Sequence, residues 1–350
     1  MCISLPRGAL ALVPFLLSPA RPEDRPPAAS EPWSVMGTYA AVSASGKDQG
    51  RLAALVGATK GIFEDLNGSL STYRPDSEVS RLSKSSAKEP VSVTKSTREV
   101  LALSVRYAEQ TGGAFDPTVA PLVFLWGFSG GKRPVRLPDA ATIEAAKRLV
   151  GYKHVIISEK SAYLDMPGMA VDLGGIAKGY AVDVAYDKLV ALGAEGFLIN
   201  LGGNVRCRGK AESARPWTIG VRNPFEKEDL VGVVHLSTGL AAATSGNYEQ
   251  FVTIEGERYC HIIDPRTGLP VKGMAGVTVI SETAVETDAL STALFVLGPE
   301  KSKPILARHP RSHALFIPDK RPLEIWVSKG FKKHFTPGPE FAGSVKDLGD

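Results

Sequence analysis

With 350 residues, 43% of them hydrophobic and 22% charged, the chain has the composition of a globular protein, with room for one large domain or two smaller ones. Its 41 basic and 37 acidic residues leave a formal net charge of +4 and are mixed along the chain, which does not indicate nucleic-acid binding. Cys2, Cys207 and Cys260 form no CxxC pair and no zinc-ligand spacing, so neither a disulfide framework nor a zinc site is indicated, and pairing of Cys207 with Cys260 stays open.

Residues 1–20 have the pattern of an export signal. Arg7 precedes the apolar run Gly8 to Leu17, and Ser18-Pro19-Ala20 then places small residues two apart. The run is too short to span a bilayer and no later segment reaches the required length, which excludes a multi-pass membrane protein. Several prolines in residues 21–33 indicate a linker. We therefore expect an exported protein whose folded domain begins near residue 34.

Four segments have the apolar spacing and the end signals of helices. They run from Leu52 to Asn67-Gly68, from Ser96 to Gly112-Gly113, from about Asp139 to Val150, and from about Ile176 to Leu192. Ser96 and Glu99 have the spacing of a capping box, which predicts the start of the second helix.

Strand-like runs follow, most of them in the second half of the chain. They are HVIIS, GFLINL, WTIGVR, VGVVHL, FVTI, GVTVI, HALFI and LEIWV. Helices concentrated in the first half and closely spaced strands in the second favour an α+β fold with a mostly antiparallel sheet. Because no linker interrupts residues 34–335, we predict a single two-lobed domain there, followed by a C-terminal tail over residues 336–350.

The run VDLGGIAKGYAVD, from Val171 to Asp183, combines a carboxylate, adjacent glycines and a lysine where we expect a strand to become a helix. Adjacent glycines let another molecule approach the backbone, and a helix start offers unpaired amides, so a phosphate site is one interpretation. A glycine-lined packing turn is the other, because the run matches neither GxGxxG nor GxxxxGK[ST].

Two further runs contain side chains that could carry chemistry. In ETDALSTALFVLG the helical pattern places Asp288 and Thr292 on one face, where their oxygens could bind Mg²⁺ or could simply be a helix acid and a core threonine. In YCHIIDP, His261 could act as a general base or could be a hydrogen-bonded core histidine in a strand. Spacing alone leaves both pairs of alternatives open.

The run Gly127-Phe128-Ser129-Gly130-Gly131 matches the GxSxG pattern of a hydrolase nucleophile. That motif needs a strand before the serine and a helix after it. The residues that follow, GGKRPVRLPD, cannot start a helix. We therefore reject Ser129 as a nucleophile and expect a loop.

Eight runs, taken in order, closely resemble the FAD:protein FMN transferase family, also called the ApbE flavin transferases. They are MGTYA, STYRPDSEVSRL, TGGAFDPTVAPLVFLWGF, VDLGGIAKGYAVD, LINLGGNV, ATSGNYE, HIIDPRTGLP and ETDALSTALFVLG, and they extend over about Met36 to Val327. The resemblance implies a secreted bacterial enzyme, in the periplasm or on the outer face of the inner membrane. Such an enzyme splits FAD at its pyrophosphate, attaches FMN through a phosphodiester to a threonine of an acceptor protein and releases AMP, with Mg²⁺ as the metal.

The implied acceptor is a flavoprotein with a short threonine-containing motif, such as a subunit of a membrane respiratory complex. Association of this chain with the membrane surface stays open. The family's metal ligands match Asp288, Thr292 and the backbone carbonyl of Ala177, and its general base matches His261. The resemblance places FAD against Met36, Tyr73, Ala114, Phe115, Asp116, Gly174, Tyr180 and Ile262.

Asp172 and Lys178 are expected to organise the glycine turn, and Asn204 and Asn247 stand where the family often has aspartate. Two other functions are alternatives to transfer. One is hydrolysis of FAD to FMN and AMP, against which Tyr73 is an argument, since family members that resemble hydrolases have asparagine there. The other is flavin binding without catalysis.

Overall fold

The computed structural model describes residues 28–45, 48–129, 134, 136–211, 215–226 and 228–349. The predicted export signal and most of the predicted linker lie outside these residues. Within the described ranges, no helix combines the length and the apolar character needed to cross a membrane.

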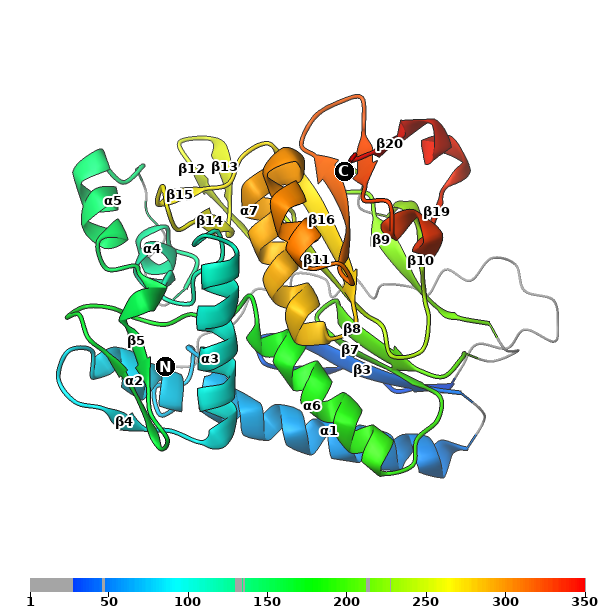
Figure 1. Cartoon of the computed structure of the whole chain (residues 1–350), viewed down its shortest axis with the longest axis horizontal. Helices are drawn as coiled ribbons and strands as arrows, with labels where there is room; N and C mark the ends of the chain where they lie inside the picture. Colours follow the sequence, from blue (N-terminus) through cyan, green and yellow to red (C-terminus); the bar gives the residue numbers. More distant parts are fainter. Residues whose placement is uncertain are drawn as a thin grey trace.

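A large, mostly antiparallel sheet forms the centre of the molecule (Figure 1). From one edge to the other its strands are β1 (Ala28–Ala29), β3 (Thr38–Ala44), β7 (Phe197–Leu201), β8 (Asn204–Arg208), β11 (Ala241–Gly246), β16 (Met274–Ser281), β17 (His313–Pro318), β18 (Ile325–Val327) and β20 (Val345–Asp347), and β2 (Trp33–Val35) pairs with β3. Neighbouring strands are antiparallel, apart from the parallel pair β18 and β20.

Both faces of the sheet are covered by other elements. Alternate residues along each strand point to opposite sides, so each strand contributes side chains to both faces. In β7, Phe197 and Ile199 pack with one apolar cluster and Leu198 packs with another. The first cluster lies under three helices, α1 (Gln49–Leu70), α6 (Ala177–Ala191) and α7 (Ala284–Arg308). The second lies under a small sheet of β9 (Trp217–Arg222), β10 (Leu230–Leu236) and β19 (Phe335–Pro337).

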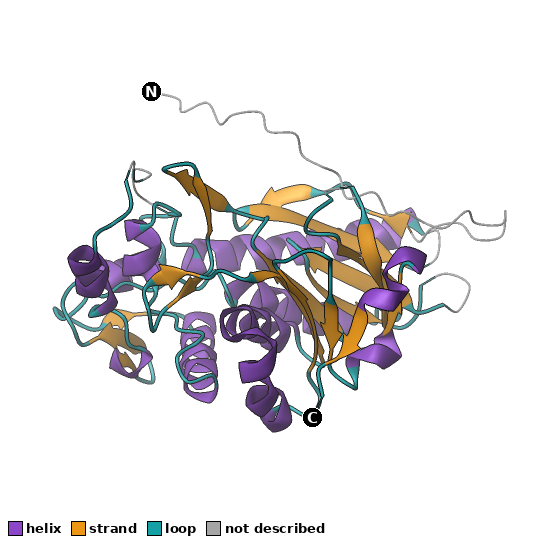
Figure 2. Cartoon of the chain, turned by 90° about the horizontal axis from the view of Figure 1, so that it is seen from above, coloured by secondary structure: helices purple, strands orange, loops and turns teal. Residues whose placement is uncertain are grey.

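A smaller lobe lies at the end of the molecule away from the C-terminal strands (Figures 1 and 2). Its helices are α2 (Glu78–Lys84), α3 (Lys95–Gln110), α4 (Ala120–Leu125) and α5 (Ala140–Lys147), and its sheet is formed by β4 (Val91–Ser92), β6 (Ser161–Leu164) and β5 (Val155–Ile157). The hairpins β12 (Phe251–Ile254) with β13 (Glu257–Cys260), and β14 (Ile263–Asp264) with β15 (Leu269–Pro270), pack on α4 through an apolar cluster that includes Trp126 and Tyr259. The prediction of an α+β domain with a mostly antiparallel sheet is confirmed.

Several element boundaries differ from the predicted ones. Thr94, and not Ser96, caps α3, because its hydroxyl accepts the amide hydrogen of Thr97 and its own amide donates to Glu78. The short helices α2 and α4 were not predicted, and α7, which is interrupted at Gly298 by a φ of 72°, lies in the half of the chain that is rich in strands.

The segment predicted as a C-terminal tail is part of the fold. Phe335–Pro337 pairs with β10, and Val345–Asp347 pairs with β18. Ala28–Ala29, from the predicted linker, pairs with β3. Cys207 and Cys260 are both buried and free, and they lie in different apolar clusters, so they do not form the disulfide that the sequence left open.

Candidate active site

A cavity of about 360 Å³ lies where the two lobes meet. Its wall includes the β2–β3 turn, the end of α1, the segment before α4, the glycine turn before α6, and α7. It brings together almost all of the predicted site residues, namely Met36, Tyr73, Ala114, Phe115, Asp116, Gly174, Ala177, His261, Ile262, Asp288 and Thr292.

Tyr180 is the predicted site residue that lies outside this lining. Its ring is buried, and its hydroxyl donates a 2.6 Å hydrogen bond to Glu99 of α3. Burial, together with this carboxylate, raises the pKa of Tyr180 to about 12. Tyr180 therefore joins α6 to α3 and does not face the cavity.

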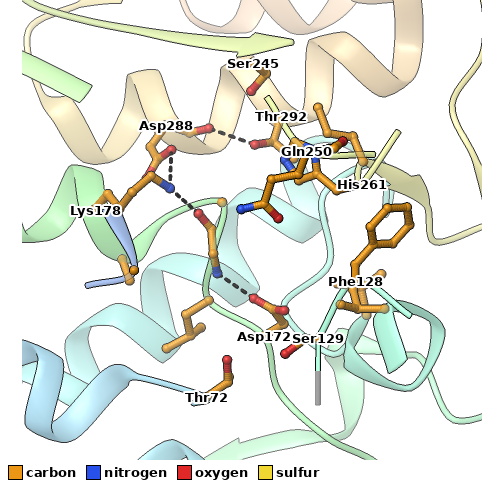
Figure 3. Close-up of a pocket in the computed structure, with 18 of the residues that line it drawn as sticks. Thr72, Phe128, Ser129, Asp172, Lys178, Ser245, Gln250, His261, Asp288 and Thr292 are labelled. Carbon is orange, nitrogen blue, oxygen red and sulfur yellow. Dashed lines mark hydrogen bonds and ion pairs between the residues drawn. The ribbon is translucent and has the colours of Figure 1, made fainter. Parts of the chain in front are cut away.

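The glycine turn follows irregular backbone and not the strand that we expected, since β6 ends at Leu164. The Asp172 carboxylate accepts a 2.7 Å hydrogen bond from the Gly174 amide, and the Lys178 ammonium donates to the Gly174 carbonyl. Both expected side chains thus organise the turn. Lys178 also lies 3.6 Å from the Asp288 carboxylate, so the turn and α7 share one cation (Figure 3).

Two glycines let α7 come close to this turn. A Cβ atom at Gly179 would lie 2.2 Å from the Ala284 carbonyl oxygen, and one at Gly175 would lie 3.0 Å from the Thr292 hydroxyl. Without these side chains, the Gly179 amide donates a 2.9 Å hydrogen bond to the Asp288 carboxylate. Glycine is therefore required at position 179 for this close packing, whereas a side chain at position 175 would displace Thr292 by a few tenths of an ångström.

The residues around Asp288 fit a hard divalent cation. The carboxylate is only 5% exposed, and burial raises its pKa. The Asn204 side chain offsets part of this rise in the pKa of Asp288, and its buried Oδ1 atom has no partner among the described residues. The Thr292 hydroxyl lies one helical turn on and donates to the Asp288 carbonyl at 3.2 Å. A carboxylate, a hydroxyl and an unpaired amide oxygen on one wall are the kind of oxygen donors that Mg²⁺ and its bound water accept.

His261 lies directly after β13 and not within a strand. Its amide and its Nδ1 are both 3.1 Å from the Gln250 carbonyl oxygen. Because a carbonyl can only accept, we assign the ring hydrogen to Nδ1, which leaves Nε2 with a free lone pair. Burial, reinforced by the charge of Lys178, lowers the pKa of His261 to about 4. The imidazole is therefore neutral at pH 7 and able to accept a proton.

Asp116 and Met36 also line the cavity. Hydrogen bonds hold the Asp116 side chain, and Met36 has an unfavourable backbone conformation. Asp116 accepts hydrogen bonds from the amide and hydroxyl of Thr118, at 2.8 and 2.6 Å, and from the Tyr152 amide at 3.0 Å. These bonds fix the carboxylate, whose pKa is raised by burial. Met36 occupies the turn between β2 and β3 with a φ of 51°, a conformation that is unfavourable for a residue with a side chain.

Sequence reasoning missed Gln250 as a functional residue. Its carbonyl sets the tautomer of His261 through a pairing across the β12–β13 hairpin, and nothing in the local sequence marks that role. Ser129 also lines the cavity. A helix, α4, and not a strand precedes it, so the strand that a nucleophile elbow needs before its serine is missing. Residues 130–133 of the predicted loop lie outside the described residues.

Comparisons with known proteins identify the family to which this chain belongs. The model of the ApbE family matches residues 36–316. The FAD:protein FMN transferase of Escherichia coli (strain K12) is 34% identical over 302 residues, which cover 85% of this chain and 86% of that protein. The FAD:protein FMN transferase of Vibrio cholerae is 34% identical over 272 residues, which cover 77% of this chain and 81% of that protein.

Solved structures match as well. The flavin transferase ApbE from Vibrio cholerae has a TM-score of 0.78 at 31% identity and covers 88% of this chain and 100% of its own. The flavinyl transferase ApbE from Pseudomonas stutzeri has a TM-score of 0.78 at 32% identity and covers 89% of this chain and 98% of its own. The family match over most of the chain and these similarities show that this chain is an enzyme of the ApbE family of flavin transferases.

Proposed function

We propose that this enzyme transfers FMN from FAD to a threonine hydroxyl of an acceptor protein, forms a phosphodiester bond and releases AMP, and that the reaction requires Mg²⁺. The observation that carries the proposal is a neutral histidine with a free Nε2 that lines the same cavity as the oxygen donors Asp288 and Thr292. A base and a cation site in one cavity are what phosphoryl transfer to a hydroxyl requires.

In the proposed reaction the threonine oxygen attacks the phosphorus on the FMN side of the pyrophosphate. A new P–O bond forms to the acceptor, the bond to the AMP phosphate breaks, and AMP leaves with the electron pair. His261 Nε2 takes the hydroxyl proton, and the Gln250 carbonyl stabilises the imidazolium through Nδ1. General-base catalysis of this kind contributes about 10²- to 10⁴-fold.

Asp288, Thr292 and the Ala177 carbonyl would hold Mg²⁺, which neutralises charge on pyrophosphate oxygens when it is bound. The chain's own contribution is to orient these donors. The Gly179 amide and Lys178 hold the two carboxylate oxygens of Asp288, and Asp172 holds the turn that carries Gly174. The glycine turn can therefore bring its backbone up to the pyrophosphate of FAD.

The acceptor in this proposal is a flavoprotein with a threonine-containing motif, such as a subunit of a membrane respiratory complex. The test mixes the protein with FAD, Mg²⁺ and a purified threonine-containing acceptor domain, and measures the acceptor's intact mass together with free FMN and AMP. Transfer predicts one FMN per acceptor and an equal amount of AMP. FMN and AMP without a modified acceptor would identify a hydrolase, and bound but unchanged FAD would identify a binding protein.

We also propose that the protein acts after export, in the bacterial periplasm or at the outer face of the inner membrane. The support is the apolar run of residues 8–17 and the small residues Ser18 and Ala20 that follow it. N-terminal sequencing of protein from cell fractions tests this. A new N-terminus near residue 21 in the periplasmic fraction is expected, and an intact N-terminus on cytoplasmic protein would contradict export.

A further inference from the structure

Helix α7 is capped by a side chain from another helix. Thr283, at its N-cap, makes no side-chain capping bond within the described part of the chain. Instead the carboxylate of Asp183, on α6, accepts hydrogen bonds from the amides of Ala284 at 2.8 Å and Val285 at 2.9 Å. A carboxylate there satisfies free amides and complements the positive end of the helix dipole. The start of α7 is therefore attached to α6.

The position of this carboxylate is itself fixed. Arg206, on β8, lies 2.8 Å from Asp183, and both side chains are 14% exposed. The guanidinium also lies 3.8 Å from the ring centroid of Tyr186, one turn further along α6. An ion pair held by a stacked arginine has little freedom to move. Three elements, α6, α7 and β8, are thus joined at one partly buried point.

Helices α6 and α7 are neighbours (Figure 1). The contacts that lead from this point to the cavity run backwards along α6 and forwards along α7. One turn back along α6, the Gly179 amide donates to Asp288, which is one turn forward along α7. Four residues before Gly179 and four residues after Asp288, Gly175 lies against Thr292. The Asp183 cap therefore sets the register that brings the oxygen donors of α7 to the glycine turn.

We propose that Asp183 is a positioning residue of the active site, which acts by capping α7 from α6 and so holds Asp288 and Thr292 opposite Ala177. Asp183 is not among the residues that line the cavity, so it acts through α7 and not on the substrate. The inference rests on the proposed function, because it takes these three residues as the Mg²⁺ site. A purely structural cap would affect stability without affecting Mg²⁺ affinity.

The test compares Asp183→Asn with a matched control, Asp139→Asn. Asp139 caps α5 by accepting from the Thr142 amide at 2.7 Å, and α5 does not line the cavity. The Kd for Mg²⁺ is measured by isothermal titration in the presence of FAD, and the melting temperature by calorimetry. Asp183→Asn is expected to melt earlier because it loses the ion pair with Arg206, whereas Asp139→Asn should melt close to the wild type because asparagine is also a good N-cap. The Kd for Mg²⁺ should rise about tenfold or more in Asp183→Asn alone, as for other residues that orient metal ligands.

A second variant separates positioning from stability. Thr283→Asp, added to Asp183→Asn, gives α7 a cap of its own without attaching it to α6. The double variant should recover the melting temperature but not the Mg²⁺ affinity. Recovery of both, or a Kd for Asp183→Asn equal to that of the control, would overturn the proposal.

Should Asp183→Asn fail to fold, Asp183→Glu provides the test. It keeps the charge beside Arg206 and moves the carboxylate by one methylene, so we expect a folded protein with weaker Mg²⁺ binding. A wild-type Kd in this variant would overturn the proposal. If the wild-type protein itself binds no Mg²⁺, the proposed function fails and this inference fails with it, whereas failure of this inference alone leaves wild-type binding intact.

Discussion

Replacing Gly179 by alanine should damage the site through a measurable displacement of α7. The added Cβ would lie 2.2 Å from the Ala284 carbonyl oxygen, and ordinary contact begins at 3.4 Å, so α7 would have to retreat by about 1.2 Å at that point. Overpacking of this kind costs about 1 to 3 kcal/mol. The gain in helix propensity from glycine to alanine, about 1 kcal/mol, offsets part of it.

The effect on catalysis should exceed the effect on stability. Asp288 accepts its hydrogen bond from the Gly179 amide and would move with α7. A misplacement of about 1 Å can cost about 10²-fold in rate, so kcat for FMN transfer should fall by that order while the protein still folds. The assay is single-turnover FMN transfer, measured beside the melting temperature.

Gly61→Ala is the matched control. Gly61 lies on the exposed side of α1, and among the described residues no atom lies within 4 Å of its added Cβ. This variant should be more stable than the wild type by about 0.5 to 1 kcal/mol and should transfer FMN at the wild-type rate. The reasoning is refuted if Gly179→Ala behaves like Gly61→Ala, because α7 would then not depend on the close approach.

Three residues of the site carry further predictions. His261→Gln should bind FAD normally but lose about 10²- to 10⁴-fold in transfer, and proportional loss of binding and activity would return His261 to a structural role. In the wild type, the active form of His261 is neutral and its pKa of about 4 lies below the ordinary 6.5, so kcat/KM should stay flat from pH 8 to 6 and fall only as the pH approaches about 4. The same lowered pKa means that its contribution to stability is present above pH 6.5 and is lost as the pH falls towards 4, which thermal melts of the wild type and His261→Gln will show as a difference confined to acidic pH. Met36→Gly should relieve about 1 kcal/mol of backbone strain at a φ of 51° and raise the melting temperature while weakening FAD binding, and unchanged FAD affinity would count against a contact between Met36 and FAD. Asp288→Ala should lose most Mg²⁺-dependent activity, and full activity of this variant at low Mg²⁺ would contradict the metal assignment.

Local sequence patterns predicted the structure correctly where a single helix or strand determines it. The i, i+4 spacing of Asp288 and Thr292 placed both on one face of a helix, and both line the cavity. The apolar run GFLINL predicted β7, and the run is almost continuously apolar because each face of the strand is buried in a different cluster. The predicted end of the fourth helix, near Gly193, was also close to the observed end of α6. Gly193, with a φ of 75°, follows that end.

Where the structure differs from the prediction, the cause is a contact with a residue that is distant in the sequence. The capping box at Ser96 was wrong because Glu78 accepts the amide and hydroxyl hydrogens of Thr94 and so helps to hold Thr94 at the N-cap. The hydrogen bond from the Tyr180 hydroxyl to Glu99 could not be predicted either, because nothing near Tyr180 in the sequence indicates that partner.

The local sequence also does not predict the structure of the C-terminal segment. Residues 336–350 form no strong strand pattern of their own, yet Val345–Asp347 adds a parallel strand to the edge of the large sheet. Pairing with an existing strand supplies the hydrogen bonds that the isolated sequence does not specify. The cap of α7 by Asp183 is likewise tertiary, since about a hundred residues separate the partners.

The most direct test of the central claim follows the phosphorus atom in the AMP half of FAD. The protein, Mg²⁺ and a threonine-containing acceptor domain are mixed with FAD that carries radioactive phosphorus in its AMP half, and a rapid quench separates acceptor from nucleotides. Attack on the FMN-side phosphorus predicts that all released label is in AMP, that the acceptor gains a flavin without label, and that a chelator stops both. Label on the acceptor, AMP release without a flavinylated acceptor, or transfer that persists with the chelator would contradict the account.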